Sequence, residues 1–104
     1  MKLEEMCRIL IENKEYEKCE EEIRKAMEEN PHSAVPHNLM GILMEKQLKH
    51  TQAMKHFRAA FDLDPTYIPA RYNMEKYGFY SDNFVNSAYD YSDCLKLKGK
   101  ENEE

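Results

Sequence analysis

The chain has 104 residues, of which 41% are hydrophobic and 34% are charged, and its formal net charge is −5. This length suits one domain with a modest core. No run of about 18 apolar residues is present and no segment is strongly basic, which argues against a membrane span and against nucleic acid as a partner. The three cysteines are odd in number and form no C-x-x-C pair. We therefore expect a reduced, cytoplasmic setting.

The first unit that we expect, residues 1–33, contains two amphipathic helices. Its apolar residues recur at spacings of three and four, which place them on one face of each helix. The first stripe is Leu3, Met6, Cys7 and Leu10, and the second is Tyr16, Cys19, Ile23, Ala26 and Met27.

The second unit, residues 34–67, repeats the first at an interval of 34 residues. Pro31 and Pro65 are 34 positions apart, and each disfavours helical geometry in the residue before it. Residues ahead of each proline also match in size at this interval, except Leu3 with His37. The matching pairs are Met6 with Met40, Cys7 with Gly41, Leu10 with Met44, Cys19 with Ala53, Ile23 with Phe57, and Ala26 with Ala60. Such a period indicates a helical repeat protein.

The third unit, residues 68–99, diverges from the other two. Glu75 and Gly78 stand where small and apolar residues are expected, so we predict that the helix is loosened or shortened near Tyr77 and Gly78. The remainder fits the pattern of a second helix through Phe84, Ser87, Tyr91, Cys94, Leu95 and Leu97. Residues 100–104 are expected to be a disordered acidic tail.

The small residues Gly41, Ala53 and Ala60, the aromatic Phe57 and the closing Pro65 together resemble the tetratricopeptide repeat family. The resemblance implies an all-α fold of three αα-hairpins, stacked as a right-handed solenoid in one domain over residues 1–99. It also implies a concave groove lined by the first helix of each hairpin. We therefore expect a non-catalytic scaffold that binds a peptide or helix of another protein.

The groove should be lined by the residues beside the core stripe of each first helix. Tyr72 and Asn73 are the favoured contacts, because Tyr is amphipathic and Asn can bond to a peptide backbone. The alternative is that these are ordinary solvated helix residues. The complete set of candidates is Arg8, Asn38, Ile42, Tyr72, Asn73 and Lys76.

An alternative function is self-association. No capping helix follows the third hairpin in this sequence, so its apolar edge could be covered by a second copy or by a flanking domain. The candidate residues for a homodimer contact are Val85, Tyr89 and Leu95, with Ala88 beside them.

We expect neither a metal nor a cofactor nor catalysis. None of the four histidines pairs with another at the i, i+4 spacing, which would place two ligands on one helix face. Cys7 and Cys19 are expected to be neighbours, with packing of two thiols favoured over a disulfide. No phosphate loop, nucleophile elbow or catalytic dyad is apparent.

Overall fold

The computed structural model describes residues 1–79 and 87–94, and this part of the chain is helical without strands. A further helical turn covers residues 91–94. None of the described helices is long and apolar enough to cross a membrane. The five α-helices are α1 (Leu3–Glu12), α2 (Tyr16–Glu29), α3 (Ala34–Lys46), α4 (His50–Leu63) and α5 (Ile68–Phe79).

The 34-residue period is confirmed in the backbone of the first two units. Lys14, between α1 and α2, and Leu48, between α3 and α4, both adopt the left-handed conformation, with φ of 60° and 62°. The same backbone hydrogen bond closes both turns, from Glu15 N to Leu10 O at 2.8 Å and from Lys49 N to Met44 O at 2.9 Å. The turns therefore share one geometry, although their sequences differ.

The prolines end the second helix of each hairpin, as the sequence predicts. Asn30 and Asp64, which precede Pro31 and Pro65, leave helical geometry with ψ of 77° and 93°. Ser33 then caps α3, because its hydroxyl oxygen accepts a hydrogen bond from the backbone N–H of Val35 at 3.3 Å. Each hairpin is thus joined to the next by a short, defined link.

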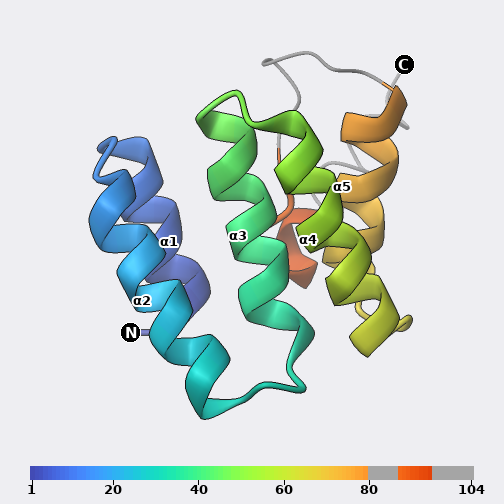
Figure 1. Cartoon of the computed structure of the whole chain (residues 1–104), viewed down its shortest axis with the longest axis horizontal. Coiled ribbons are helices and arrows are strands. Elements are labelled where there is room, and N and C mark those ends of the chain that lie inside the picture. The colour runs from blue at the N-terminus through green and yellow to red at the C-terminus, as the bar shows by residue number, and fades with distance from the viewer. Residues whose placement is uncertain (80–86, 95–104) are drawn as a thin grey trace.

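The helices form two layers (Figure 1). In the inner layer, α3 contacts both α1 and α5, and in the outer layer α2 and α4 each pack against α3. Helix α3 is therefore surrounded by the other four helices. Ten of its thirteen residues are buried, as expected for a helix that is apolar around most of its circumference.

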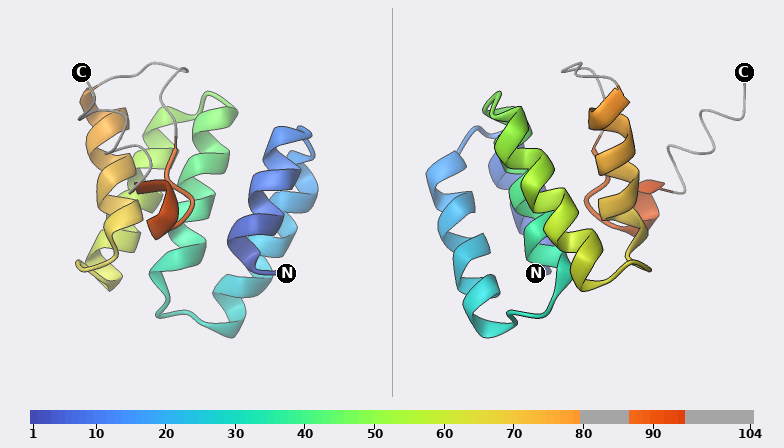
Figure 2. Two further views of the ribbon diagram at one scale, coloured as in Figure 1. Left: turned by 180° about the vertical axis from the view of Figure 1, so that it is seen from behind. Right: turned by 45° about the vertical axis from the view of Figure 1, so that its right-hand side comes forward.

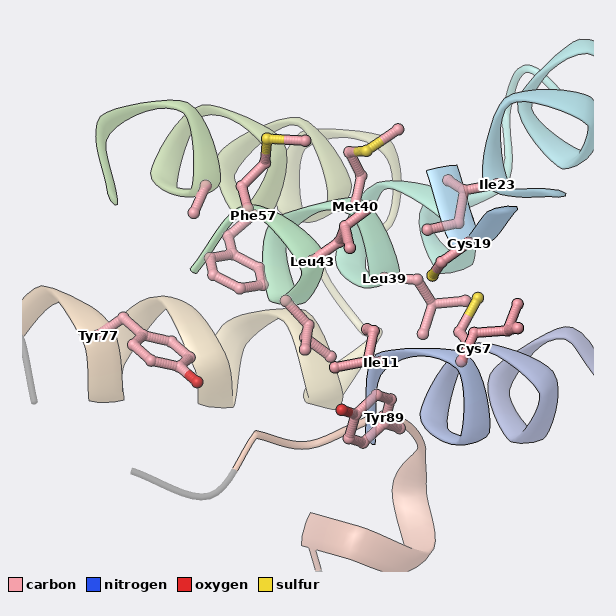
Figure 3. Packing of buried hydrophobic residues seen from close by; sticks show 14 residues of the cluster. Cys7, Ile11, Cys19, Ile23, Leu39, Met40, Leu43, Phe57, Tyr77 and Tyr89 are labelled. Carbon is pink, nitrogen blue, oxygen red and sulfur yellow. The ribbon is translucent and has the colours of Figure 1, made fainter. Parts of the chain in front are cut away.

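Small residues allow the two helices of each hairpin to approach closely. Cys7 and Cys19 are fully buried between α1 and α2, with their thiols pointing toward each other (Figure 3). In the second hairpin, the ring of Phe57 occupies the space beside Gly41, so that a Cβ at position 41 would overlap with the ring. Cys7 and Cys19 are thus neighbours, as the sequence predicts, and both thiols are free.

The third unit departs from the expected hairpin. Helix α5 runs through Tyr77 and Gly78 without a break, and its last described residue is Phe79, so the structure shows no loosening at Gly78 itself. A continuous second helix is wrong over residues 87–90, which are irregular and bent before the turn at 91–94. Residues 87–94, hereafter segment 87–94, instead cross the inner layer in front of α3, between α1 and α5 (Figure 2). We call this side of α1, α3 and α5 the inner face. The expected tail at 100–104 lies outside the described residues.

Candidate functional site

Two asparagines at the centre of the inner face bind the backbone N–H and carbonyl group of one residue, Ala88, in segment 87–94. Asn38 of α3 and Asn73 of α5 are both fully buried, and Asn73 Nδ2 donates to Asn38 Oδ1 at 2.8 Å. The Asn73 side chain also accepts from the N–H of Ala88 at 2.7 Å and donates to its carbonyl oxygen at 2.8 Å. Asn38 Nδ2 donates to the same oxygen at 3.0 Å.

These contacts explain why segment 87–94 is not helical at Ala88. The amide side chains supply the hydrogen-bond partners that a helix would otherwise provide for the N–H and the carbonyl group of this residue. Because the atoms of Ala88 that Asn38 and Asn73 bond to are both backbone atoms, the two asparagines recognise the main chain rather than a particular side chain. The arrangement is therefore suited to holding an irregular stretch of chain.

Side-chain contacts flank the backbone of Ala88. On one side, the hydroxyl groups of Tyr77 and Ser87 form a short hydrogen bond. On the other side, the guanidinium carbon of Arg8 lies 4.5 Å from the centroid of the Tyr89 ring, and Arg8 Nη2 donates to Asp93 Oδ2 at 2.5 Å. Arg8 thus binds both the aromatic and the acidic side chain of the segment.

The carboxylate of Asp93 also shapes the segment itself. Its Oδ2 atom accepts from the backbone N–H of Tyr89 at 2.9 Å, while the N–H of Asp93 donates to Asp90 Oδ1 at 3.1 Å. These bonds fold residues 89–93 so that the Tyr89 ring and the Asp93 carboxylate face Arg8 together. The aromatic and acidic contacts are consequently one geometric unit.

The electrostatics of this unit favour the charged form of Arg8. Burial alone would lower the pKa of Arg8, but the hydrogen bond and negative charge of Asp93 raise it above its ordinary value. Burial raises the pKa of Tyr89, although the positive charge of Arg8 opposes that shift. At neutral pH the contact is therefore between a guanidinium, a carboxylate and a neutral phenol.

Tyr91 of segment 87–94 contacts the link between α4 and α5. The hydroxyl of Tyr91 donates to the carbonyl oxygen of Thr66 at 3.2 Å. The rings of Tyr91 and Tyr67 meet edge to face, with centroids 5.5 Å apart. The described contacts of the segment therefore extend from α1 to the start of α5.

The structure brings together three of the six candidate groove residues. Arg8, Asn38 and Asn73 all hydrogen-bond to segment 87–94, and Ile42 is fully buried in the apolar cluster that also contains Tyr89 of the segment. Ile42 was assigned to the groove on its position beside the core stripe, but α3 is enclosed by its neighbours on several sides. Tyr72 and Lys76 are half-buried on α5, with Lys76 Nζ 5.5 Å from the centroid of the Tyr72 ring.

The candidates for self-association have different positions. Tyr89 is only 7% exposed and belongs to the same apolar core cluster as Ile11 of α1, so it does not lie on an uncovered edge (Figure 3). Ala88 is fully buried as well. Val85 and Leu95 lie outside the described residues. The exposed edge expected at residues 88 and 89 is therefore replaced by an intramolecular contact.

Tyr77 and Asp93 are contacts of the inner face that are not among the predicted residues. Asp90 and Asp93 were one available signal, because two aspartates three residues apart favour the start of a helical turn over the middle of a helix. Nothing local to Tyr77 indicates that it contacts Ser87. These contacts depend on where segment 87–94 crosses the inner face.

A histidine pair lies apart from this site, between α3 and α4. The Nδ1 atoms of His37 and His56 are 3.4 Å apart, and burial lowers the pKa of both side chains. Over residues 1–79 and 87–94, no three His, Cys, Asp or Glu side chains are grouped so as to hold a metal ion. The pair is best described as part of the contact between the two helices.

Comparisons with family models, with curated proteins and with solved structures found no match to this chain.

Proposed function

We propose that this chain is a non-catalytic protein-binding scaffold of the tetratricopeptide type. Its inner face would hold an irregular peptide segment of a partner protein across α1, α3 and α5. The observation that carries the proposal is the pair of buried asparagines, whose amide groups bond to the N–H and carbonyl group of Ala88. A face that holds one irregular segment in this way has the chemistry required to hold another.

The proposal follows from the kinds of contact on the inner face. A buried amide side chain without a partner costs about 1–3 kcal/mol, so Asn38 and Asn73 are suited to a face that is covered by a peptide backbone. Arg8 adds a cation that is accessible enough to exchange partners, since its side chain is 35% exposed. Asn38 and Asn73 would therefore bind the backbone of a peptide at the centre of the inner face, and Arg8 would select for an acidic side chain beside it.

The competing explanation is that segment 87–94 only completes the core of this chain. In that case the segment would be as permanent as the helices, and no other peptide would bind at Asn38 and Asn73. The two explanations differ in whether a peptide added in solution reaches the inner face.

A selection from a random display library tests the proposal directly. The full chain is immobilised, bound 12-residue peptides are enriched, and their contacts are mapped by amide chemical shifts in NMR. We expect shifts at the side chains of Asn38 and Asn73, and weaker binding to the Asn38→Ala/Asn73→Ala variant. The matched control is Gln52→Ala/Arg58→Ala, which alters two exposed residues of α4 in the outer layer.

Enrichment of peptides that bind equally well to the inner-face variant and to the outer-layer variant would contradict the proposal. So would failure to enrich any peptide above the library background. Far-ultraviolet circular dichroism of both variants shows whether the helices are retained.

A further inference from the structure

Segment 87–94 occupies the inner face as a peptide ligand would, so its contacts indicate which side chains a bound peptide would need. On the premise of the proposed function, we propose that the partner peptide has the pattern small–aromatic–x–x–x–acid. In this chain the pattern is represented by Ala88, Tyr89 and Asp93. We further propose that segment 87–94 is an intramolecular competitor, which the partner peptide must displace.

The small residue is required at the position that the asparagines grip. Ala88 is fully buried, and its N–H and carbonyl group both bond to the side chain of Asn73. A larger side chain there would have to displace packed neighbours, because protein interiors hold few voids. Gly, Ala or Ser therefore fits this position.

The aromatic residue and the acid are required because Arg8 contacts both. The guanidinium lies over the Tyr89 ring at 4.5 Å and bonds to Asp93 Oδ2 at 2.5 Å. The interval of four residues matters, because the bond from Tyr89 N to Asp93 Oδ2 brings the two side chains to the same guanidinium. An acid at another interval would not make both contacts.

The ion pair of Arg8 and Asp93 is compatible with replacement of segment 87–94 by an acidic peptide from another protein. Asp93 is the partner of Arg8 in this structure, and its side chain is 11% exposed while that of Arg8 is 35% exposed. A partner peptide with its own carboxylate replaces one ion pair with an equivalent one, so exchange does not leave Arg8 unpaired. This property is expected of a site with an exchangeable occupant.

The test uses a fluorescent synthetic peptide of residues 86–95 carrying C94S, with binding followed by fluorescence anisotropy. The receptor is the full chain with Tyr89→Ala and Asp93→Ala, which remove the side chains that hold the segment to Arg8. We expect this opened receptor to bind the peptide at least about tenfold more tightly than the parent chain does, because the competitor is weakened. Ala88→Lys provides a second opened receptor, in case the first does not fold.

Specificity is tested by changing the peptide and the receptor together. Peptides with Tyr89→Ala or Asp93→Asn, and the Arg8→Asp change in the opened receptor, should each weaken binding about tenfold. A peptide with Asp93→Arg should recover part of the binding to the Arg8→Asp receptor, because the charges are exchanged although the cation–π contact and the bond from Tyr89 N are lost. Rescue of this kind is not expected if Arg8 only stabilises the fold.

Two outcomes would overturn this inference. The first is absence of binding to both folded opened receptors, or binding that is indifferent to Tyr89→Ala and Asp93→Asn. The second is a parent chain that light scattering shows to be a dimer and an opened receptor that is a monomer, since the segment would then be exchanged between two copies. If the display selection enriches inner-face peptides without the pattern, the proposed function stands and only the ligand class fails.

Discussion

The contact between α3 and α4 and the inner face of α1, α3 and α5 are held together by different forces. Between α3 and α4, Phe57 packs against Gly41 in an apolar contact. On the inner face, Asn38, Asn73 and Arg8 make directional polar contacts with a segment much later in the chain. Apolar packing of this density resists rearrangement, whereas hydrogen bonds exchange between protein and water at a small net cost. The comparison suggests a rigid scaffold with an exchangeable occupant.

The largest effect is expected from Phe57→Ala, which empties the space between α3 and α4. The ring is fully buried, so its removal leaves a cavity. We expect the free energy of unfolding, measured with urea, to fall by about 3–5 kcal/mol. Phe61→Ala, at a half-buried position on the same helix, should cost less. Equal losses would show that the ring of Phe57 is not the main contact of this hairpin.

Glycine-to-alanine substitutions at Gly41 and Gly78 compare a closely packed position with one that has room for a side chain. At Gly41 a Cβ would overlap with the Phe57 ring, so we expect Gly41→Ala to lower stability by about 1–3 kcal/mol despite the better helix propensity of Ala. At Gly78 the nearest atom, Met54 Cε, would lie 3.6 Å from the new Cβ. The same substitution there should be neutral or stabilise α5 by up to about 1 kcal/mol. Thermal unfolding of both variants makes the comparison, and a stable Gly41→Ala protein would contradict it.

The ion pair of Arg8 and Asp93 on the inner face should contribute less to the free energy of unfolding than the apolar contacts do. A double-mutant cycle of Arg8→Ala and Asp93→Ala should give a coupling energy of about 0.5–1 kcal/mol, because Arg8 is partly open to solvent. The control is the more exposed pair of Arg24 and Glu20, four residues apart on α2. Its coupling should be about 0.3–0.5 kcal/mol. A coupling at Arg8 no larger than at Arg24 would mean that segment 87–94 is not held by charge.

The smallest effect concerns pH and belongs to the contact between α3 and α4. Burial lowers the pKa of His37 and His56 below the ordinary value of 6.5. Below about pH 6.5 the unfolded chain therefore takes up protons that the folded chain does not. Stability from the neutral pair is thus present above pH 6.5 and lost as the pH falls.

Urea unfolding between pH 8 and 5 measures this dependence. The decline should be shallower in His56→Phe, while His32→Phe, at an exposed position, should follow the parent chain. If all three proteins lose stability in parallel, the histidine pair is not its source.

The sequence predicts the hairpins well because the determinants of each hairpin are local. The positions of Pro31 and Pro65, the small residue Gly41 and the apolar stripes specify helices and turns that repeat at 34 residues. The sequence also places Asn38 and Asn73 on one face. Ile42 is fully buried in the apolar cluster that also contains Tyr89, which a stripe on a single helix does not show.

The path of segment 87–94 could not be predicted in the same way. Ser87, Tyr91 and Cys94 have the spacing of a helix, and within the segment that pattern competes with the turn favoured by Asp90. The outcome depends on partners such as Asn38 and Arg8, which are 50 and 85 residues distant from Ala88 and Asp93. Spacing along one segment carries no information about such contacts.

Hydrogen exchange at the backbone N–H of Ala88 tests most directly whether segment 87–94 can leave the inner face while the helices remain folded. In the parent chain this N–H donates to Asn73 Oδ1 and should be protected. Asn73→Ala should accelerate its exchange by about 5–150-fold, the equivalent of about 1–3 kcal/mol, while amides in α3 and α4 keep their protection. Asn13→Ala, at an exposed position, is the control. Unchanged exchange at Ala88, or equal loss of protection throughout α3 and α4, would contradict an exchangeable segment on a rigid scaffold.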